Sequence, residues 1–179
     1  PILFIKPATS LQPISRPIVI PDYTKECHNE TELAVLIGKE ISRAGRQEVE
    51  AAVAGFGIAL DLTLRDIQKS LKEKGLPWEK AKAFDGSCPI SAFVKPDDLP
   101  NPQDTRLKLE VNGLVRQDES TKLMINKIFD LIVYMCDFFT LLPGDVVLTG
   151  TPAGVAALQS GDRLALELDG RFRFSASVA

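Results

Sequence analysis

The sequence predicts an α+β fold in which several short strands accompany a few helices. Residues 107–117 alternate apolar and polar side chains around Asn112-Gly113, a dipeptide typical of a two-residue β-hairpin turn. Residues 123–139 place their apolar side chains at helical spacing along one stripe. Strands are predicted over 30–37 and 53–60, because the apolar runs 33–37 and 53–60 are short and end abruptly, which favours buried strands over helices.

Length and composition indicate one globular domain over residues 1–179. The chain has 179 residues, of which 45% are hydrophobic, enough for a full core. Its 21 basic and 24 acidic residues give a net charge of −3 without a basic stripe, which argues against nucleic acid as a partner. Residues 1–179 contain no signal peptide and no apolar run long enough to cross a membrane.

Five prolines in residues 1–21 exclude a long helix at the start of the chain. Short extended pieces at 2–5 and 18–20 remain compatible with that spacing. The chain has no initiator Met and enters an apolar run directly after Pro1. We therefore expect an N-terminal segment to precede Pro1.

The cysteine and histidine content excludes several kinds of site. Cys27, Cys88 and Cys136 have no CxxC spacing and are odd in number, which argues against a disulfide framework or a zinc site and favours a reducing, cytoplasmic setting. His28 is the only histidine, so any serine nucleophile would have to use it. The sequence has no nucleophile elbow, phosphate loop or dinucleotide fingerprint.

Glu30 and Glu32 lie at the start of the predicted strand 30–37. Side chains two residues apart in a strand point to the same face, so these two carboxylates should lie side by side. On a half-buried face they repel each other unless one is protonated or a cation lies between them. The alternative is a solvent-facing strand edge, where both simply meet water.

A short amphipathic helix is predicted over 46–54, and the second apolar strand then ends at Asp61. A helix is predicted from about residue 63 to residue 73, ended by Gly75 and Pro77. Asp61, Arg65 and Gln68 have the spacing i, i+4, i+7 and should stack along one helical face.

Three carboxylates are a reasonable number of protein ligands for Mg²⁺ or Mn²⁺, because these ions prefer oxygen ligands and keep other coordination positions for water or substrate. Arg65 could then bind a substrate carboxylate, and Gln68 could orient a carbonyl or a water. In the alternative interpretation Asp61 caps the helix and Arg65 is its salt-bridge partner.

Two later segments add candidate residues. Residues 78–85 hold the only tryptophan together with Lys80 and Lys82, and spacing does not decide which lysine, if either, joins Arg65 around an anion. A strand over 145–149 then runs into a loop at 150–155 that contains Gly150 and Gly154 and either lets the backbone approach a ligand or forms an ordinary tight turn.

Four stretches of the chain resemble the fumarylacetoacetate hydrolase family, in its smaller acylpyruvase-like branch. They span the chain in the family's order, which makes chance agreement improbable. The stretches are His28-Asn29-Glu30-Thr31-Glu32-Leu33, residues 60–68 (LDLTLRDIQ), residues 74–85 (KGLPWEKAKAFD) and residues 148–155 (LTGTPAGV).

The resemblance implies a mixed β-sheet roll with peripheral helices, usually assembled as a homodimer. It implies that Glu30, Glu32 and Asp61 bind Mg²⁺ or Mn²⁺. It also implies that Arg65, Gln68, Lys82 and Thr151 surround the substrate, with Lys82, Arg65 and Gln68 taking part in catalysis, and so favours Lys82 over Lys80.

The function implied by the resemblance is metal-dependent cleavage of the carbon–carbon bond of acylpyruvates such as fumarylpyruvate or acetylpyruvate, giving pyruvate and a carboxylic acid. Close relatives decarboxylate or tautomerise oxaloacetate, which is the alternative activity. Two departures are noted: Asn29 stands where relatives often have a second histidine, and the family's catalytic His-Glu pair lies on a segment before the position of Pro1. A non-catalytic module that binds a metal and a dicarboxylate is therefore the competing class.

Overall fold

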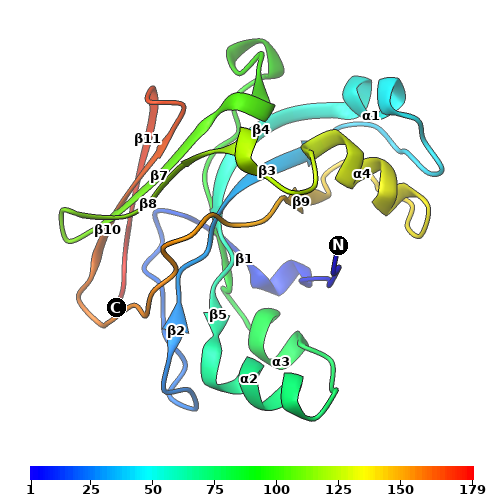
Figure 1. Cartoon of the computed structure of the whole chain (residues 1–179). Helices are drawn as coiled ribbons and strands as arrows, with labels where there is room; N and C mark the ends of the chain where they lie inside the picture. The colour runs from blue at the N-terminus through cyan, green and yellow to red at the C-terminus, as the bar shows by residue number, and fades with distance from the viewer.

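The computed structural model describes all residues from 1 to 179, and its strands form three sheets (Figure 1). The largest sheet has five strands in the order β1-β6-β4-β3-β9, of which only β1 and β6 pair in parallel. The five strands are β1 (Leu11–Pro13), β6 (Cys88–Ile90), β4 (Val53–Leu60), β3 (Thr31–Ile37) and β9 (Val146–Leu148). The short strands β2 (Cys27–His28) and β5 (Thr63–Leu64) form a separate antiparallel pair.

A four-stranded antiparallel sheet stands beside the first and closes the core from the other side (Figure 1). Its order is β11-β10-β7-β8, with β7 (Arg106–Val111), β8 (Leu114–Ser120), β10 (Arg163–Leu168) and β11 (Phe172–Ser177). One cluster of 30 buried residues joins both sheets, including Val35 and Ile58 from the first and Leu109 and Leu166 from the second. The expected α+β class, a mixed β-sheet roll, is confirmed.

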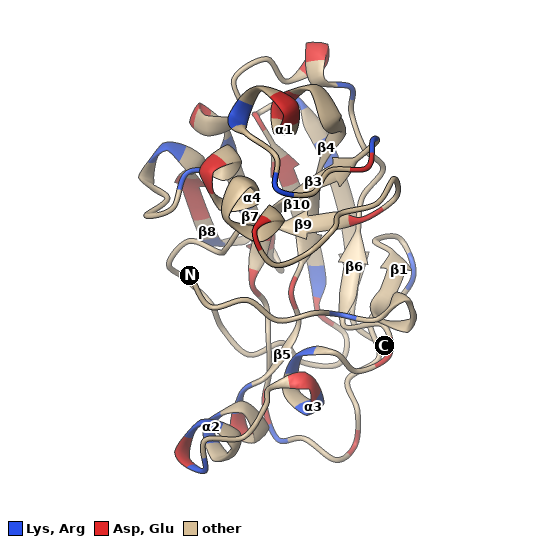
Figure 2. Cartoon of the chain, turned by 90° about the vertical axis from the view of Figure 1, so that its right-hand side faces the viewer, with Lys and Arg blue, Asp and Glu red and all other residues tan.

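The helices lie in two pairs at the periphery. α1 (Arg46–Ala52) packs against α4 (Ile128–Cys136), and α2 (Arg65–Glu73) packs against α3 (Glu79–Lys82) beside the β2–β5 pair (Figure 1). Figure 2 shows the N-terminal segment crossing between these two pairs, and acidic and basic residues mixed along α2 and α3. None of the helices combines the length and the apolar character that crossing a membrane requires. Four 3₁₀ turns complete the chain at Ala8–Ser10, Pro96–Asp98, Pro102–Asp104 and Thr121–Leu123.

The strand predictions agree closely with the structure. β3 and β4 match the strands predicted over 30–37 and 53–60 and pair antiparallel, with Thr31 opposite Leu60. The turn between β7 and β8 has positive φ at both central residues, 53° at Asn112 and 77° at Gly113, as a type I′ turn requires. The strand predicted over 145–149 is β9, one residue shorter at each end.

The helix predicted over 123–139 was too long at both ends, since α4 covers only Ile128–Cys136. The apolar pattern begins at residue 123, but α4 begins only at Ile128, whose N–H donates to Gln103 Oε1 over 2.8 Å. Residues 121–123 form a 3₁₀ turn instead, because the Ser120 hydroxyl accepts from the Lys122 N–H and fixes that turn. The spacing of apolar residues gives no indication of such a side-chain cap.

Three further boundaries also differ. α1 ends at Ala52, because Val53 already pairs in β4. α2 begins at Arg65 rather than at residue 63, because residues 63–64 pair with β2. At the N-terminus residues 2–5 join no sheet, and within 18–20 only Ile18 forms a bridge, to Val178.

We expect the core between the sheets to tolerate truncation poorly. Val35→Ala removes two methyl groups from a side chain with no exposed surface and should lower the free energy of unfolding by about 2 kcal/mol. Val19→Ala makes the same change at a side chain that is 69% exposed and should cost less than about 0.5 kcal/mol. Urea unfolding of both variants tests this expectation, and equal losses would contradict it.

Candidate active site

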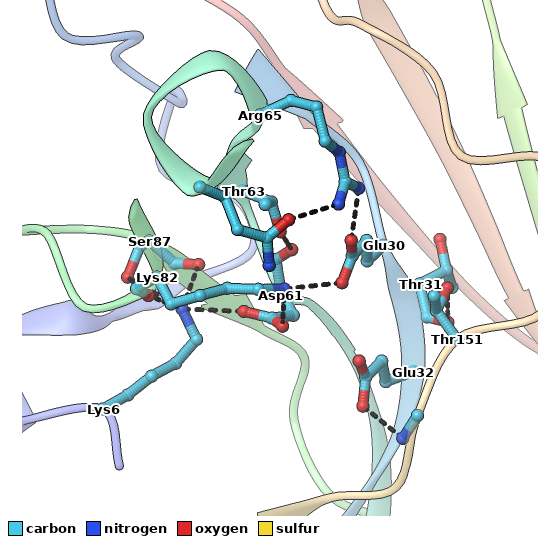
Figure 3. Close-up of polar contacts among 12 residues, drawn as sticks. Lys6, Glu30, Thr31, Glu32, Asp61, Thr63, Arg65, Lys82, Ser87 and Thr151 are labelled. Atoms are coloured by element: carbon cyan, nitrogen blue, oxygen red, sulfur yellow. Dashed lines mark hydrogen bonds and ion pairs between the residues drawn. The ribbon is translucent and has the colours of Figure 1, made fainter. Parts of the chain in front are cut away.

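Three carboxylates meet where β3 begins and β4 ends (Figure 3). Because Thr31 lies opposite Leu60, Glu30 and Asp61 are neighbours across the ladder, and the Asp61 N–H donates to the Glu30 carbonyl over 2.8 Å. One oxygen from each of Glu30, Glu32 and Asp61 lies within 4.8 Å of the others. The structure therefore brings the three predicted metal ligands together, on one side of β3 as the strand period requires.

Asp61 reaches this cluster by strand pairing and not by the helical stacking that its spacing suggested. α2 begins four residues later, so only Arg65 and Gln68 share a helical face. The alternative in which Asp61 caps the helix and pairs with Arg65 was wrong. Leu64 occupies the N-cap position, and Arg65 Nη2 lies 2.5 Å from Glu30 Oε1 instead.

Lys82 lies between two of the carboxylates. Its Nζ is 2.6 Å from Glu30 Oε2 and 2.5 Å from Asp61 Oδ2, and the residue is 3% exposed (Figure 3). It comes from α3, a single helical turn within the segment that sequence left unassigned. Lys80, two residues earlier, is exposed on the outer side of that turn.

Arg65 and Gln68 lie above the carboxylates on the first turn of α2. Arg65 Nη1 donates to Gln68 Oε1 over 2.7 Å, so the two side chains orient each other while Arg65 also contacts Glu30. The backbone of Arg65 is fixed by its N–H, which donates to the Glu26 carbonyl over 2.8 Å. Substrate binding by these residues stays a prediction, but the Arg65 guanidinium faces the carboxylate cluster (Figure 3), and Gln68 is held beside it by the bond to Nη1.

Lys6 is a site residue that sequence reasoning missed. Its Nζ lies 2.8 Å from Asp61 Oδ1 and donates to Ser87 Oγ over 3.0 Å and to the Lys82 carbonyl (Figure 3). Ser87 in turn donates to the same carbonyl over 2.9 Å. The available signal was a lysine that directly follows the apolar stretch 2–5 and precedes Pro7, where a charge is out of place unless it is paired.

The carboxyl groups of Glu30 and Glu32 differ in their electrostatic environments. Burial opposes ionisation of Glu30, but the Lys82 ammonium and the Arg65 guanidinium outweigh it and hold the pKa of this carboxyl below its usual range. Burial and the negative charge of Asp61 raise the pKa of Glu32 to about 8, although the Gly150 N–H bound to Glu32 Oε2 acts in the opposite direction. Glu32 is therefore the one carboxylate of the cluster that lacks a cationic partner.

These residues fit a divalent cation. One oxygen from each of the three carboxylates lies within 4.8 Å of the other two, and Glu32 is buried with no cation paired to it. A hard cation beside Glu32 would supply the missing positive charge, as Mg²⁺ or Mn²⁺ does at carboxylate sites. Metal binding by Glu30, Glu32 and Asp61 stays a prediction that this geometry supports.

The chain after β9 contacts strand β3. Thr151 Oγ1 donates to the Thr31 carbonyl over 2.9 Å, and Thr149 Oγ1 donates to the Leu33 carbonyl over 2.9 Å. Gly154 has φ near 100°, and a Cβ there would lie 1.9 Å from the Arg116 carbonyl oxygen. The close approach that this glycine permits is thus to the chain's own strand β8 and not to a ligand.

His28 and the cysteines contribute no reactive group to the cluster. His28 Nε2 lies 3.4 Å from Glu26 Oε2, outside the three carboxylates. All three cysteines are buried and free, and burial raises the pKa values of Cys27 and Cys88 to about 12, so neither is a thiolate at neutral pH.

Comparison with known proteins gives a consistent result. A family model described as fumarylacetoacetate (FAA) hydrolase C-terminal matches residues 1–178. The chain is 54% identical over 171 residues to the oxaloacetate tautomerase YcgM of Escherichia coli K12, covering 95% of this chain and 78% of that protein.

Two solved structures have the same fold. A Yersinia pestis protein assigned to the fumarylacetoacetate hydrolase family has a TM-score of 0.98 and 50% identity, covering 100% of this chain and 84% of that one. The fumarylpyruvate hydrolase of Pseudomonas aeruginosa, solved in complex with Mn²⁺ and pyruvate, has a TM-score of 0.93 and 35% identity, covering 98% of this chain and 77% of that one.

The raised pKa of Glu32 predicts pH-dependent metal binding. Below about pH 8 the metal-free protein holds a proton on Glu32 that a bound cation must displace. Mg²⁺ affinity should therefore rise up to about tenfold per pH unit between about pH 6 and pH 8 and level off above that. Titration calorimetry in two buffers of different ionisation enthalpy measures both the affinity and the released proton.

Glu32→Gln is the matched variant for that titration. It keeps the size of the side chain but has no proton to release, so its weaker Mg²⁺ binding should vary little over the same pH range. A wild-type affinity that is independent of pH, with no proton released, would contradict the prediction.

Proposed function

The chain belongs to the fumarylacetoacetate hydrolase family, in its acylpyruvase-like branch, and on this basis we propose that it is a metal-dependent oxaloacetate tautomerase. The observation that carries the proposal is the balance of buried charge. Three cations, Lys6, Lys82 and Arg65, face the three carboxylates, so the cluster is neutral when all are ionised. A divalent cation adds two positive charges, and oxaloacetate, a dianion at neutral pH, cancels them.

Glu30, Glu32 and Asp61 would hold Mg²⁺ or Mn²⁺, which when bound supplies a Lewis acid for the carboxylate and keto oxygens of a 2-oxo acid. The similarity to an oxaloacetate tautomerase at 54% identity supports this choice of substrate. Hydrolysis of acylpyruvates, the activity that the resemblance placed first, is kept as the second candidate.

Three groups around the cluster would bind the substrate. Arg65 uses two of its five N–H groups on Glu30 and Gln68, so others remain for a carboxylate. The Gln68 side chain accepts from Arg65 through Oε1, which leaves its Nε2 free to donate to a substrate oxygen. The hydroxyl proton of Thr151 is already bound to the Thr31 carbonyl, so this residue would offer its backbone N–H instead.

Lys82 is our candidate for the proton carrier. Conversion of the enol to the keto form adds a proton to C3 and removes one from the enol hydroxyl, with no water consumed. The Lys82 ammonium would donate to C3, and the resulting amine would take the hydroxyl proton, so the side chain ends as it began. Glu30 and Asp61 hold Nζ in place through both short contacts throughout.

Lys82→Met should therefore lower kcat for oxaloacetate tautomerisation by about 100-fold or more, because it removes both the proton carrier and a site charge. Lys80→Met makes the same change two residues away on the exposed side of α3 and should leave kcat within about twofold. The rate is measured by the loss of enol absorbance. Equal kcat values for the two variants would exclude Lys82 from the reaction.

Asp61→Ala should abolish Mg²⁺ or Mn²⁺ binding and tautomerisation together, because it removes one of three ligands and the partner of both lysines. Asp66→Ala is the control, since Asp66 lies on α2 and its carboxylate accepts from Thr24 Oγ1 and the Lys25 N–H, away from the cluster. Chelation of the wild-type protein should reproduce the loss. Full activity of Asp61→Ala would contradict the proposed site.

The second candidate is favoured by the similar fumarylpyruvate hydrolase, whose structure holds Mn²⁺ and pyruvate. The three activities can be distinguished by their products in one experiment. Tautomerisation changes enol absorbance without releasing pyruvate, decarboxylation releases pyruvate and carbon dioxide from oxaloacetate, and hydrolysis releases pyruvate and an acid from fumarylpyruvate or acetylpyruvate. Binding of Mn²⁺ and pyruvate without any turnover would indicate the non-catalytic module.

We also propose a cytoplasmic homodimer. Three free thiols are consistent with a reducing compartment. Large apolar side chains are exposed along and after α4 and would supply a contact surface between two copies. These side chains are Tyr134, Phe138, Phe139 and Leu142.

A further inference from the structure

We propose that Gln117 is a positioning residue for the reaction. Its side chain connects the metal strand (residues 29–32, at the start of β3) and the substrate loop (residues 150–155, after β9) to the four-stranded sheet. Gln117 lies on β8, remote in sequence from both segments, and is 1% exposed. The inference deepens the proposed function, because it rests on Glu30, Glu32 and Thr151 forming the site.

The carbonyl oxygen of Gln117 binds the strand that carries the metal ligands. Gln117 Oε1 accepts from the Thr31 N–H over 3.0 Å and from Asn29 Nδ2 over 2.9 Å. Thr31 lies between Glu30 and Glu32, and Asn29 immediately precedes them. One buried amide oxygen thus fixes the backbone that carries both carboxylates, at the strand edge that the loop after β9 also contacts.

The amide nitrogen of Gln117 binds the loop after β9. Gln117 Nε2 donates to Thr151 Oγ1 over 2.8 Å and to the Pro152 carbonyl over 2.9 Å. Since Thr151 Oγ1 accepts this bond, its own proton is directed to the Thr31 carbonyl. The Gln117 amide and the Thr151 hydroxyl therefore connect β8, β3 and the loop in one closed set of hydrogen bonds.

Only a neutral amide satisfies all four contacts. Two donors face Oε1, and a hydroxyl and a carbonyl face Nε2, so a reversed amide would place two donors against the Thr31 N–H. A carboxylate would keep the two accepted bonds but repel the Pro152 carbonyl, and an apolar chain would keep neither pair. Each unpaired group left in this buried position is costly.

The backbone around Gln117 also supports the loop directly. Gly154 lies so close to β8 that a Cβ would be 1.9 Å from the Arg116 carbonyl oxygen and 3.2 Å from Gln117 Cγ. The far end of the loop is thus packed on the strand that carries Gln117, while its near end binds Glu32 through the Gly150 N–H. A displacement of Gln117 would therefore shift the metal strand and the substrate loop together.

The test compares Gln117→Met and Gln117→Glu by amide hydrogen exchange and by kinetics. In Gln117→Met the amides of Thr31 and Gly150 should both exchange faster. In Gln117→Glu the Thr31 amide should stay protected, since an acceptor remains, and only the Gly150 amide should exchange faster. For Gln117→Met, kcat/KM for oxaloacetate and Mn²⁺-dependent pyruvate affinity should fall about 10- to 100-fold, the cost typical of removing a residue that orients a metal site.

Gln103→Met is the control for a purely structural effect. Gln103 is a bridging amide too, donating to the Thr121 carbonyl and accepting from the Ile128 N–H, outside the site. Loss of the Gln103 amide should speed amide hydrogen exchange near those residues only and leave kcat/KM for oxaloacetate within about twofold. Unchanged Thr31 and Gly150 exchange in Gln117→Met, or the same change in Gln103→Met, would overturn the inference.

Failure of the proposed function has a different signature. If the wild-type protein binds Mn²⁺ and pyruvate without converting oxaloacetate, the tautomerase proposal fails, whereas the exchange pattern and pyruvate affinity of the Gln117 variants still decide the role of this residue.

Discussion

Mutual repulsion among three buried carboxylates is the constraint on which the site depends. At separations near 4.8 Å, two unit charges repel by about 3 to 4 kcal/mol at the effective dielectric constant of about 20 that suits protein interiors. Three such pairs would be a large fraction of the stability of a domain of this size. Glu30, Glu32 and Asp61 can persist in one place only if positive charge or protons lie among them.

The fold brings that positive charge from three separate segments. The N-terminal segment contributes Lys6, α2 contributes Arg65 and α3 contributes Lys82, although only the last two are near one another in sequence. Glu32 receives no cation and instead has a raised pKa, which marks the place where a divalent ion has most to add. The short helices α2 and α3 thus pack apolar side chains against the core and also bring Arg65 and Lys82 to the carboxylates.

The part of the site that sequence could predict is the part set by local geometry. The two-residue period of a strand places Glu30 and Glu32 on one face, and an apolar run that stops at Asp61 predicts a carboxylate at a strand end. Arg65 and Gln68 follow from helical spacing. Lys82 did not follow from spacing, because the turn of α3 that points it inward is fixed by contacts with residues far away in the chain; the family resemblance alone favoured it over Lys80.

The unpredicted parts depend on long-range contacts. Lys6 is separated from Asp61 by the whole β3–β4 hairpin, and Gln117 meets Thr151 only because the second sheet packs on the first. The predicted starts of two helices were wrong for a related reason. Residues 63–64 pair with β2 and so cannot join α2, and hydrogen bonds of Gln103 and Ser120 set the start of α4. Hydrophobic periodicity describes which residues are buried, but not which distant partner ends an element.

The most direct test of the site is a crystal structure of the protein with Mn²⁺ and pyruvate, with the manganese located by its anomalous scattering. We expect one peak about 2.0 to 2.4 Å from an oxygen of each of Glu30, Glu32 and Asp61, with pyruvate beside it and facing Arg65. A protein saturated with Mn²⁺ that shows its peak elsewhere, or none among these three carboxylates, would contradict the metal site and the function built on it.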